Sequence, residues 1–534
     1  MRSLYMPGRS TVHATNGMAA TSQPLSTFTA IQILQQGGNA MDAAIAAVAV
    51  QCVVEPQSTG IGGDCFCLYK PHDGELVGFN GSGRAPAAAN VQWYCDNSID
   101  QIERQSPHAV TVPGVIDAWE QLSADYSTMQ LKDLLQPAIR YANEGFPVNH
   151  RVNFDWQLCL DLLSNDPAGA KYYLSDGKAP PIGSIVKLPL LAETLFHIAE
   201  QGREGFYDGW VAEDIVAFLR GQGGLHTQED FANARGEYVT PIKTDYWGYE
   251  VYECPPNGQG VVALALLNIL AGLDMKNIDP NSAERRHIEI EAARLAYRDR
   301  EGVIADPAFV DVPVEAWLSE NHAARNRDLI DRSKRLADLP PSPLAAAIHN
   351  DTVYLTVVDG ERNAVSFINT LFYPFGSGLV APKSGVVLHN RGQGFVLDPD
   401  HPNCIAPGKR PLHTIIPGML MKDGRAQMPF GVMGGHYQAA GHAHLLVNLL
   451  DYEMDLQEAI EDTRVFPDFS DGANTVQVED GMADTVRKEL EALGHATYVP
   501  DRPIGGAQAI WIDWEEGVLR GGSDPRKDGC AIGF

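Results

Sequence analysis

The stretch "HNDTVYLTVVDGERNAVSFINT", residues 349–370, predicts two β-strands joined by a short polar turn. The turn "DGERN" is centred on Glu361. Antiparallel pairing about this residue joins positions whose numbers add up to twice 361, so Tyr354 faces Ile368 and Thr352 faces Thr370. Side chains alternate between the two faces of a strand, so Thr352 and Tyr354 share one face. The sequence alone therefore predicts two threonine hydroxyls side by side at the open end of the hairpin.

The segment before the hairpin, "LPPSPLAAAIHN" (339–350), predicts a linker because three prolines lie close together in it. The first strand then opens abruptly at Asp351-Thr352. Threonine is an ordinary strand residue, and cross-strand threonine pairs also occur for stability alone. The hairpin by itself is thus compatible with a structural role or a catalytic role for the two threonines.

The bulk composition excludes several classes of partner. A chain of 534 residues can bury a large core, and its length would permit two to four domains. The formal net charge of -28 repels phosphate backbones and anionic membrane surfaces, so we expect no nucleic-acid and no membrane partner. The first residues contain no continuous apolar segment of a secretory signal, and the apolar run 261–273 is too short to span a bilayer. The eight cysteines are scattered without a CxxC pair, which indicates reduced thiols in a cytoplasmic protein.

The order of the expected elements indicates a layered fold. Residues 23–56 predict two helices, the first ending at Gly37-Gly38 and the second capped by Asn39. After Thr352 the strands "VYLTVVD", "NAVSFINTLF", "SGVVLHN", "AQMPFGVM" and "GAQAIWID" mix with helices near 437–450 and 484–494. Regular βαβ alternation is missing, which favours an α/β sandwich over a doubly wound sheet.

Several stretches match one family in its own order: "GMAATSQPLSTFTAIQILQQGGNAMDAAIAAVAVQCVVEPQSTGIGGDCF", "VTVPGVIDAWEQL", "YECPPNGQG", "DTVYLTVVDGERNAVSFINT", "FGSGLVAPKSGVVLHN" and "GVMGGH". Over nearly its whole length the chain resembles the gamma-glutamyltransferase (gamma-glutamyl transpeptidase) family of N-terminal nucleophile hydrolases. The resemblance implies a four-layer αββα sandwich with helical additions. It also implies one precursor that cuts itself between Asp351 and Thr352. Residues 1–351 would then form the large subunit and 352–534 the small subunit of a single core.

The resemblance implies a complete set of catalytic groups. A threonine hydroxyl needs a base, and the α-amine that the cut creates on Thr352 can serve because such amines titrate near pH ~8. The family's second threonine, which hydrogen-bonds that amine, corresponds to Thr370. Its oxyanion amides correspond to Gly434 and Gly435, in a strand–Gly-Gly–helix pattern that lets backbone N–H groups approach a developing anion. The same pattern can also need glycine only for its backbone dihedrals.

The acyl pocket is where the sequence departs from the family. The family's arginine for the substrate α-carboxylate has its counterpart in Arg84, which lies two places off the usual spacing. The family's positions for holding the α-amine carry Phe372, Arg391 and Gly394, and its paired serines fall on His413 and Thr414. Positive groups at Arg84, Arg391 and His413 predict a carboxylate without a neighbouring ammonium, as in a glutaryl or oxamyl group. Arg391 can equally be a structural or surface arginine.

Three functions therefore stay open. The first is an amidase or transferase that cleaves a gamma-glutamyl amide of the glutathione type and passes the acyl group to water or an amino acceptor. The second is an acylase for glutaryl- or oxamate-type amides, and the third is an uncut protein that binds a metabolite. His436 and His442 lie six apart and no HExxH is present, so we expect no metal and no cofactor. Whether the cut pair forms a homo-oligomer is also open, and Asp524 and Arg526 are expected to pair structurally.

Overall fold

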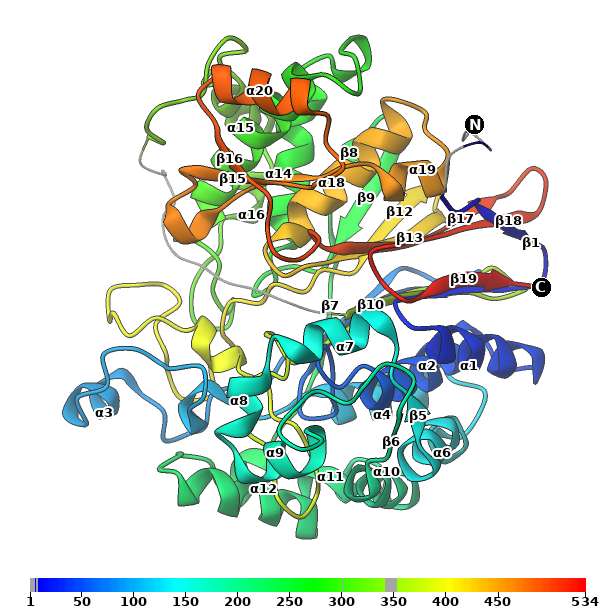
Figure 1. Ribbon diagram of the computed structural model, residues 1–534, viewed down its shortest axis with the longest axis vertical. Coiled ribbons are helices and arrows are strands. Elements are labelled where there is room, and N and C mark those ends of the chain that lie inside the picture. Colours follow the sequence, from blue (N-terminus) through cyan, green and yellow to red (C-terminus); the bar gives the residue numbers. More distant parts are fainter. Residues whose placement is uncertain (1–4, 6–7, 301, 341–352) are drawn as a thin grey trace.

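The computed structural model of the chain describes residues 5, 8–300, 302–340 and 353–534. Two seven-stranded sheets lie face to face, and helices cover the outer side of each sheet (Figure 1). The αββα sandwich that the sequence predicts is thereby confirmed.

The first sheet contains the hairpin at its centre and is antiparallel throughout, in the order β19-β2-β10-β11-β3-β4-β7. Its strands are β2 (Met18–Thr21), β3 (Asp64–Lys70), β4 (Val77–Gly81), β7 (Glu237–Val239), β10 (Val353–Val358), β11 (Ala364–Thr370) and β19 (Cys530–Gly533). Val353 pairs with Asn369 and Val358 with Ala364, which is the register that the sequence predicts.

The second sheet has the order β1-β18-β17-β13-β12-β9-β8. Its strands are β1 (Val12–Ala14), β8 (Ile242–Tyr246), β9 (Tyr249–Glu253), β12 (Gly418–Lys422), β13 (Arg425–Met433), β17 (Gly506–Asp513) and β18 (Val518–Ser523). Apolar side chains of both sheets, among them Phe66, Ile368 and Met419, form a core between them. The Tyr354 hydroxyl bonds with Ser366 Oγ at 2.9 Å, and Ser366 Oγ donates to the Phe430 carbonyl at 3.2 Å, so polar contacts also join the sheets.

One outer layer packs on the first sheet and holds the two helices expected between residues 23 and 56. They are α1 (Pro24–Gln35) and α2 (Ala40–Val54), and Asn39 caps α2 in a capping box with Asp42, as predicted. Every residue of α2 is buried, because the helix lies between the sheet and further helices. The other elements up to residue 239 are α3 (Val91–Asp96), η1 (Pro107–Ala109), α4 (Val115–Tyr126), α5 (Leu131–Leu134), α6 (Gln136–Glu144), β5 (Phe146–Pro147), α7 (His150–Gln157), α8 (Leu160–Ser164), α9 (Pro167–Tyr173), β6 (Ile185–Val186), α10 (Pro189–Gln201), α11 (Glu204–Tyr207), α12 (Gly209–Gly221) and α13 (Gln228–Ala232).

The opposite layer packs on the second sheet, with α14 (Gly260–Ala271), α15 (Ala283–Arg300) and α18 (Tyr437–Leu450) at its centre (Figure 1). The apolar run 261–273 is thus the buried helix α14, and no helix among the described residues is long and apolar enough to cross a membrane. The remaining elements are η2 (Met275–Asn277), α16 (Val314–Trp317), α17 (Glu320–Arg327), η3 (Arg391–Gly394), α19 (Leu456–Glu461), β14 (Val465–Pro467), η4 (Phe469–Asp471), β15 (Thr475–Val478), α20 (Asp484–Ala492) and β16 (Ala496–Tyr498).

Candidate active site

The expected nucleophile and cut site, Thr352 and Asp351, lie outside the described residues, which resume at Val353. The hairpin that follows them is fully buried on both strands. Its second strand, β11, ends at Thr370, which lies opposite Asp64 at the start of β3. Thr370 is therefore the expected catalytic residue of this hairpin that lies within the described part of the chain.

Thr370 is buried and shapes the turn that follows β11. Its Oγ1 accepts a hydrogen bond from the Phe372 N–H at 2.8 Å. Phe372 has φ = 79°, a conformation that bulky L-residues rarely adopt. Strain of this kind persists only where the surroundings hold it, and it is concentrated at functional sites.

Arg391, at the start of η3, is the buried cation of this region. Its Cζ lies 3.7 Å from the centroid of the Phe372 ring, and Nη2 donates to Thr414 Oγ1 at 3.3 Å. Nε and Nη1 have no acceptor within the part of the chain that the structure describes. Burial lowers the pKa of Arg391 to about 9. A buried guanidinium with two unsatisfied nitrogens is costly, and a bound anion would remove that cost.

His413 lies beside Arg391, and the sequence predicts a positive charge on it as well. Its Nε2 donates to Asp64 Oδ2 at 2.9 Å, while its Nδ1 accepts from the Ile415 N–H at 3.4 Å. Burial, together with the nearby Arg391, lowers the pKa of His413 to about 3. The lowered pKa favours a neutral, hydrogen-bonding His413, and its role in holding the substrate carboxylate stays a prediction.

Asp64 is the carboxylate that organises the hydrogen bonds of this buried cluster. It accepts from the Gly83 N–H at 2.8 Å and from His413, and its Oδ2 lies 3.4 Å from His389 Nδ1. Burial alone would raise the pKa of Asp64, but the two histidines hold it well below its usual range. No sequence pattern points to Asp64 or His389, because only the fold brings Asp64 opposite Thr370 and His389 beside Asp64.

Arg84 occupies a different position from Arg391. Its Nη1 lies 3.4 Å from Asp306 Oδ2 and 3.1 Å from the Gly408 carbonyl, and its Nη2 lies 3.7 Å from Glu237 Oε2. Its side chain is 33% exposed and lines a separate cavity of about 320 Å³. Arg84 thus has carboxylate partners of its own, whereas Arg391, His413 and Thr414 lie together.

The expected oxyanion turn connects β13 to α18. Gly434 and Gly435 have φ values of 122° and 58°, which favour glycine, and a Cβ on Gly434 would lie 2.8 Å from the Cα of Gly505. Among the described residues, no acceptor binds the N–H groups of Gly434 or Gly435. The helix α18 starts two residues later, so its N-terminal end adds a favourable potential for negative charge.

A glutamine joins this turn to the acyl pocket, and sequence reasoning missed it. Gln259 Nε2 donates to the Gly435 carbonyl at 2.9 Å and to the Thr414 carbonyl at 2.8 Å. Its Oε1 accepts from Arg300 Nη1 at 2.8 Å. The residue stands in "YECPPNGQG", a stretch that marks the family but carries no recognisable catalytic pattern.

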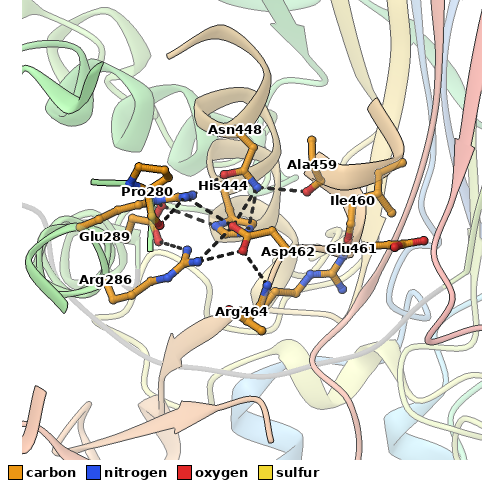
Figure 2. A network of polar contacts seen from close by, with 12 residues as sticks. Pro280, Arg286, Glu289, His444, Asn448, Ala459, Ile460, Glu461, Asp462 and Arg464 are labelled. Carbon is orange, nitrogen blue, oxygen red and sulfur yellow. Dashed lines mark hydrogen bonds and ion pairs between the residues drawn. The ribbon is translucent and has the colours of Figure 1, made fainter. Parts of the chain in front are cut away.

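A buried charge network fixes α15, which carries Arg300 at its end, against α18 and α19. Figure 2 shows Arg286 and Glu289 of α15 facing His444 and Asn448 of α18, with Asp462 between them. Arg286 donates to Glu289 at 3.2 Å and to Asp462 at 3.0 Å. The expected structural pairing of Asp524 and Arg526 is also present, at 3.3 Å.

Within the described part of the chain, one group of residues could in principle ligate a metal: His287, Glu291 and His495, all buried. The two histidines hydrogen-bond each other at 2.7 Å, and His287 Nε2 bonds with the Asp331 carbonyl at 2.8 Å. Arg294 Nη1 donates to Glu291 at 2.8 Å. These contacts occupy both nitrogens of His287 and one carboxylate oxygen of Glu291, while His495 Nδ1 has no partner among the described residues; we assign no metal there.

Comparison with known proteins gives a consistent result. The family model described as Gamma-glutamyltranspeptidase matches residues 26–534. The "Glutathione hydrolase-like YwrD proenzyme" of Bacillus subtilis (strain 168) is 37% identical over 529 residues, covering 98% of this chain and 99% of the relative. The "Oxamate amidohydrolase proenzyme" of Klebsiella pneumoniae is 33% identical over 534 residues, covering 98% and 99%.

A solved structure agrees with these sequence relatives. The crystal structure of a cephalosporin acylase from Bacillus halodurans superposes with a TM-score of 0.93 at 39% sequence identity, covering 100% of this chain and 98% of that chain. The sequence relatives and this structure match the chain from end to end, so the similarity includes the hairpin, the Gly434–Gly435 turn and the Arg391 region.

Proposed function

The chain belongs to the gamma-glutamyltranspeptidase family of N-terminal nucleophile hydrolases, and on that basis we propose that it matures by a cut between Asp351 and Thr352. The proposed large fragment is 1–351 and the proposed small fragment is 352–534. Several relatives of the chain are named proenzymes, which supports maturation from one precursor.

Thr352 is the proposed nucleophile in both maturation and turnover. Continuing the observed register of β10 and β11 by one step pairs position 352 with Thr370. In maturation, Thr352 Oγ attacks the Asp351 carbonyl, the peptide nitrogen becomes a free amine, and water hydrolyses the resulting ester. In turnover, the same oxygen attacks a substrate amide while the α-amine accepts its proton and passes it to the leaving amine. Thr370 orients that amine, and the N–H groups of Gly434 and Gly435 stabilise the oxyanion.

The preferred acyl group is proposed to carry a carboxylate without an adjacent ammonium, as a glutaryl group and the oxalyl group of oxamate do. The observation that carries this proposal is Arg391, which is buried with Nε and Nη1 unsatisfied. A carboxylate accepts two parallel N–H bonds from a guanidinium. Asp64, the acid in this pocket, is already hydrogen-bonded by Gly83 and His413, so it offers little to an ammonium group.

A gamma-glutamyl amide is the second candidate, since Arg391 could hold its α-carboxylate as well. The "Glutathione hydrolase proenzyme" of Escherichia coli (strain K12) is 32% identical over 541 residues and favours this reading. The compartment is proposed to be cytoplasmic, which the eight cysteines, all described and all unpaired, support.

Two measurements test the proposal. Edman degradation of the smaller band on a denaturing gel should begin Thr-Val-Tyr-Leu, and Thr352→Ala should leave one full-length band and no turnover. An uncut wild-type chain without amidase activity would indicate the metabolite-binding alternative. Glutaryl, oxalyl and γ-glutamyl p-nitroanilides, each with and without a dipeptide acceptor, then identify the acyl group. A strong preference for γ-glutamyl would reject the proposed preference for a carboxylate without an adjacent ammonium.

A further inference from the structure

We propose that Gln259 is a positioning residue that couples carboxylate binding at Arg391 to the geometry of the oxyanion turn. The proposal rests on the function proposed above, and goes beyond it by joining two parts of the site that lie on different segments of the chain. Gln259 itself touches no reacting atom in this scheme.

The backbone around Gln259 is held against the acyl pocket. The Gln259 N–H donates to the His413 carbonyl at 2.9 Å, and the His413 N–H donates to the Asn257 carbonyl at 2.8 Å. The side chain of Gln259 is fully buried. A glutamine that is fixed at its backbone and shielded from water has few alternative hydrogen-bond partners. The two hydrogen bonds that its side-chain –NH₂ group donates therefore define the position of the side chain.

On the oxyanion side, the amide of Gln259 fixes a carbonyl within the turn. The Gly435 carbonyl accepts from Gln259 Nε2 at 2.9 Å and from the Gln438 N–H at 3.2 Å. The Gly434 carbonyl accepts from the Tyr437 N–H at 3.1 Å, which fixes the peptide plane that carries the Gly435 N–H. Because Gly435 has φ = 58°, losing the Gln259 bond would free a residue with many accessible conformations.

On the acyl side, the same amide nitrogen fixes Thr414. Gln259 Nε2 donates to the Thr414 carbonyl at 2.8 Å, and Arg391 donates to the Thr414 hydroxyl at 3.3 Å. An anion bound by Arg391 therefore acts on Thr414, and the Thr414 carbonyl and the Gly435 carbonyl of the oxyanion turn both accept from the –NH₂ group of Gln259. A shift on either side changes the hydrogen-bond geometry on the other side.

Arg300 settles which way the Gln259 amide faces. Its Nη1 donates to Gln259 Oε1, so the –NH₂ group must point at the two carbonyls. Arg300 also contacts His436, the residue after the turn, and it ends the helix α15 that the network in Figure 2 attaches to α18. The glutamine is thus held from a rigid element and not from a loop.

If Gln259 positions the oxyanion donors, its loss should lower kcat and leave KM nearly unchanged, because those donors act on the transition state. We expect kcat for glutaryl p-nitroanilide to fall about 10- to 100-fold in Gln259→Leu, with KM within about 3-fold, since removing an oxyanion donor outright costs about 100- to 1,000-fold. Gln259→Glu should behave alike, because it keeps the acceptor for Arg300 but loses the shared –NH₂ group. It also serves if the leucine variant fails to fold.

The matched control is Gln427→Leu, a buried glutamine near the start of β13 that donates to the Ile512 carbonyl. It should retain wild-type kcat within about 3-fold. A fall in kcat of similar size in the control would mean that the loss in the Gln259 variants comes from general disruption of the core, and it would overturn the proposal.

Coupling is measured by combining Gln259→Leu with Arg391→Met and comparing glutaryl with pentanoyl p-nitroanilide. If the two residues are coupled, the loss of kcat for glutaryl p-nitroanilide in the double variant is smaller than the product of the two single losses. In addition, Gln259→Leu should remove the excess of the glutaryl kcat over the pentanoyl kcat that the wild type shows. Losses that multiply, or a normal kcat in both Gln259 variants, reject the coupling. Wild-type enzyme without amidase activity would instead reject the proposed function on which it rests.

Discussion

Two of the places where this protein buries arginine side chains treat the charge in opposite ways. In the α15 network, Arg285 and Arg286 meet Glu289 at 2.9 and 3.2 Å and share Asp462. In the acyl pocket, Arg391 is bonded to one hydroxyl oxygen, while its Nε and Nη1 have no acceptor among the described residues. Burial is similar in both places, but the network arginines contact carboxylates directly, whereas Asp64, the carboxylate near Arg391, is not among the groups that Arg391 hydrogen-bonds.

The difference separates structure from binding. A buried cation that has its own carboxylates is part of the scaffold, and here it joins α15 to α18 and α19. A buried cation without a carboxylate is stable only because the rest of the fold compensates for it, which is the condition of a preformed anion site. Proteins accept such a local cost at functional sites.

The network should respond most strongly to the loss of its shared acid. Glu289→Gln removes the carboxylate that contacts both Arg285 and Arg286 and leaves them to share Asp462, and breaking buried pairs in this way costs about 3–5 kcal/mol. The free energy of unfolding in guanidinium chloride measures it. A loss below about 1 kcal/mol would mean that these arginines are as unpaired as Arg391, and the comparison would fail.

Substitution of Arg391 in the proposed acyl pocket should change the enzymatic activity. Arg391→Met should lower kcat/KM for glutaryl p-nitroanilide about 100-fold, or roughly 2.7 kcal/mol, because one bidentate charged contact is lost. The rate with pentanoyl p-nitroanilide should change little. Glu289→Gln, assayed where it is folded, should keep the wild-type ratio between the two substrates, and a changed ratio there would contradict the division between scaffold and site.

The same Arg391→Met variant should be more stable than the wild type. Replacing a buried unpaired cation by an apolar side chain of similar volume removes a desolvation cost, so we expect a gain of about 1–2 kcal/mol in the free energy of unfolding. Free glutarate should raise the melting temperature of the wild type and not of the variant. Destabilisation by Arg391→Met would show that the pocket needs this charge for folding.

The smallest expected effect concerns pH. Burial lowers the pKa of His444 below the value of about 6.5 for an unfolded histidine, although Glu289 and Asp462 act in the opposite direction. The unfolded chain then binds protons that the folded chain rejects, so stability is present above about pH 6.5 and is lost as the pH falls below it. Other buried histidines contribute with the same sign, hence His444→Asn should reduce the loss of stability between pH 7 and pH 5 without abolishing it. If the free energy of unfolding falls as steeply between pH 7 and pH 5 in the variant as in the wild type, His444 does not contribute to the pH dependence.

The sequence predicted the parts of the protein that depend on local rules. The hairpin register about Glu361, the Asn39 cap and the bounds of α18 follow from turn symmetry, capping and periodicity, and each is confirmed. The family relationship is confirmed as well.

What the sequence could not predict depends on which distant segments meet. The pairing of Asp64 with Thr370 follows from strand order, and the burial that lowers the pKa of His413 follows from the packing of distant segments around it. Arg84 was expected beside Arg391, yet its nearest carboxylates come from Glu237 and Asp306, in other segments. Gln259 has no motif at all, because its importance comes from two carbonyls that only the folded chain brings together.

The strand order has one more consequence. In the first sheet β2 lies between β10 and β19, and β3 borders β11, while in the second sheet β1 and β9 flank strands from the C-terminal third of the chain. The two polypeptides made by the proposed cut would therefore be interwoven, with hydrogen-bonded ladders on several borders. When enzyme matured in heavy-isotope medium is mixed with enzyme matured in ordinary medium, we expect no molecules that combine a heavy fragment with a light one. Each molecule should keep the two fragments that arose from its own precursor.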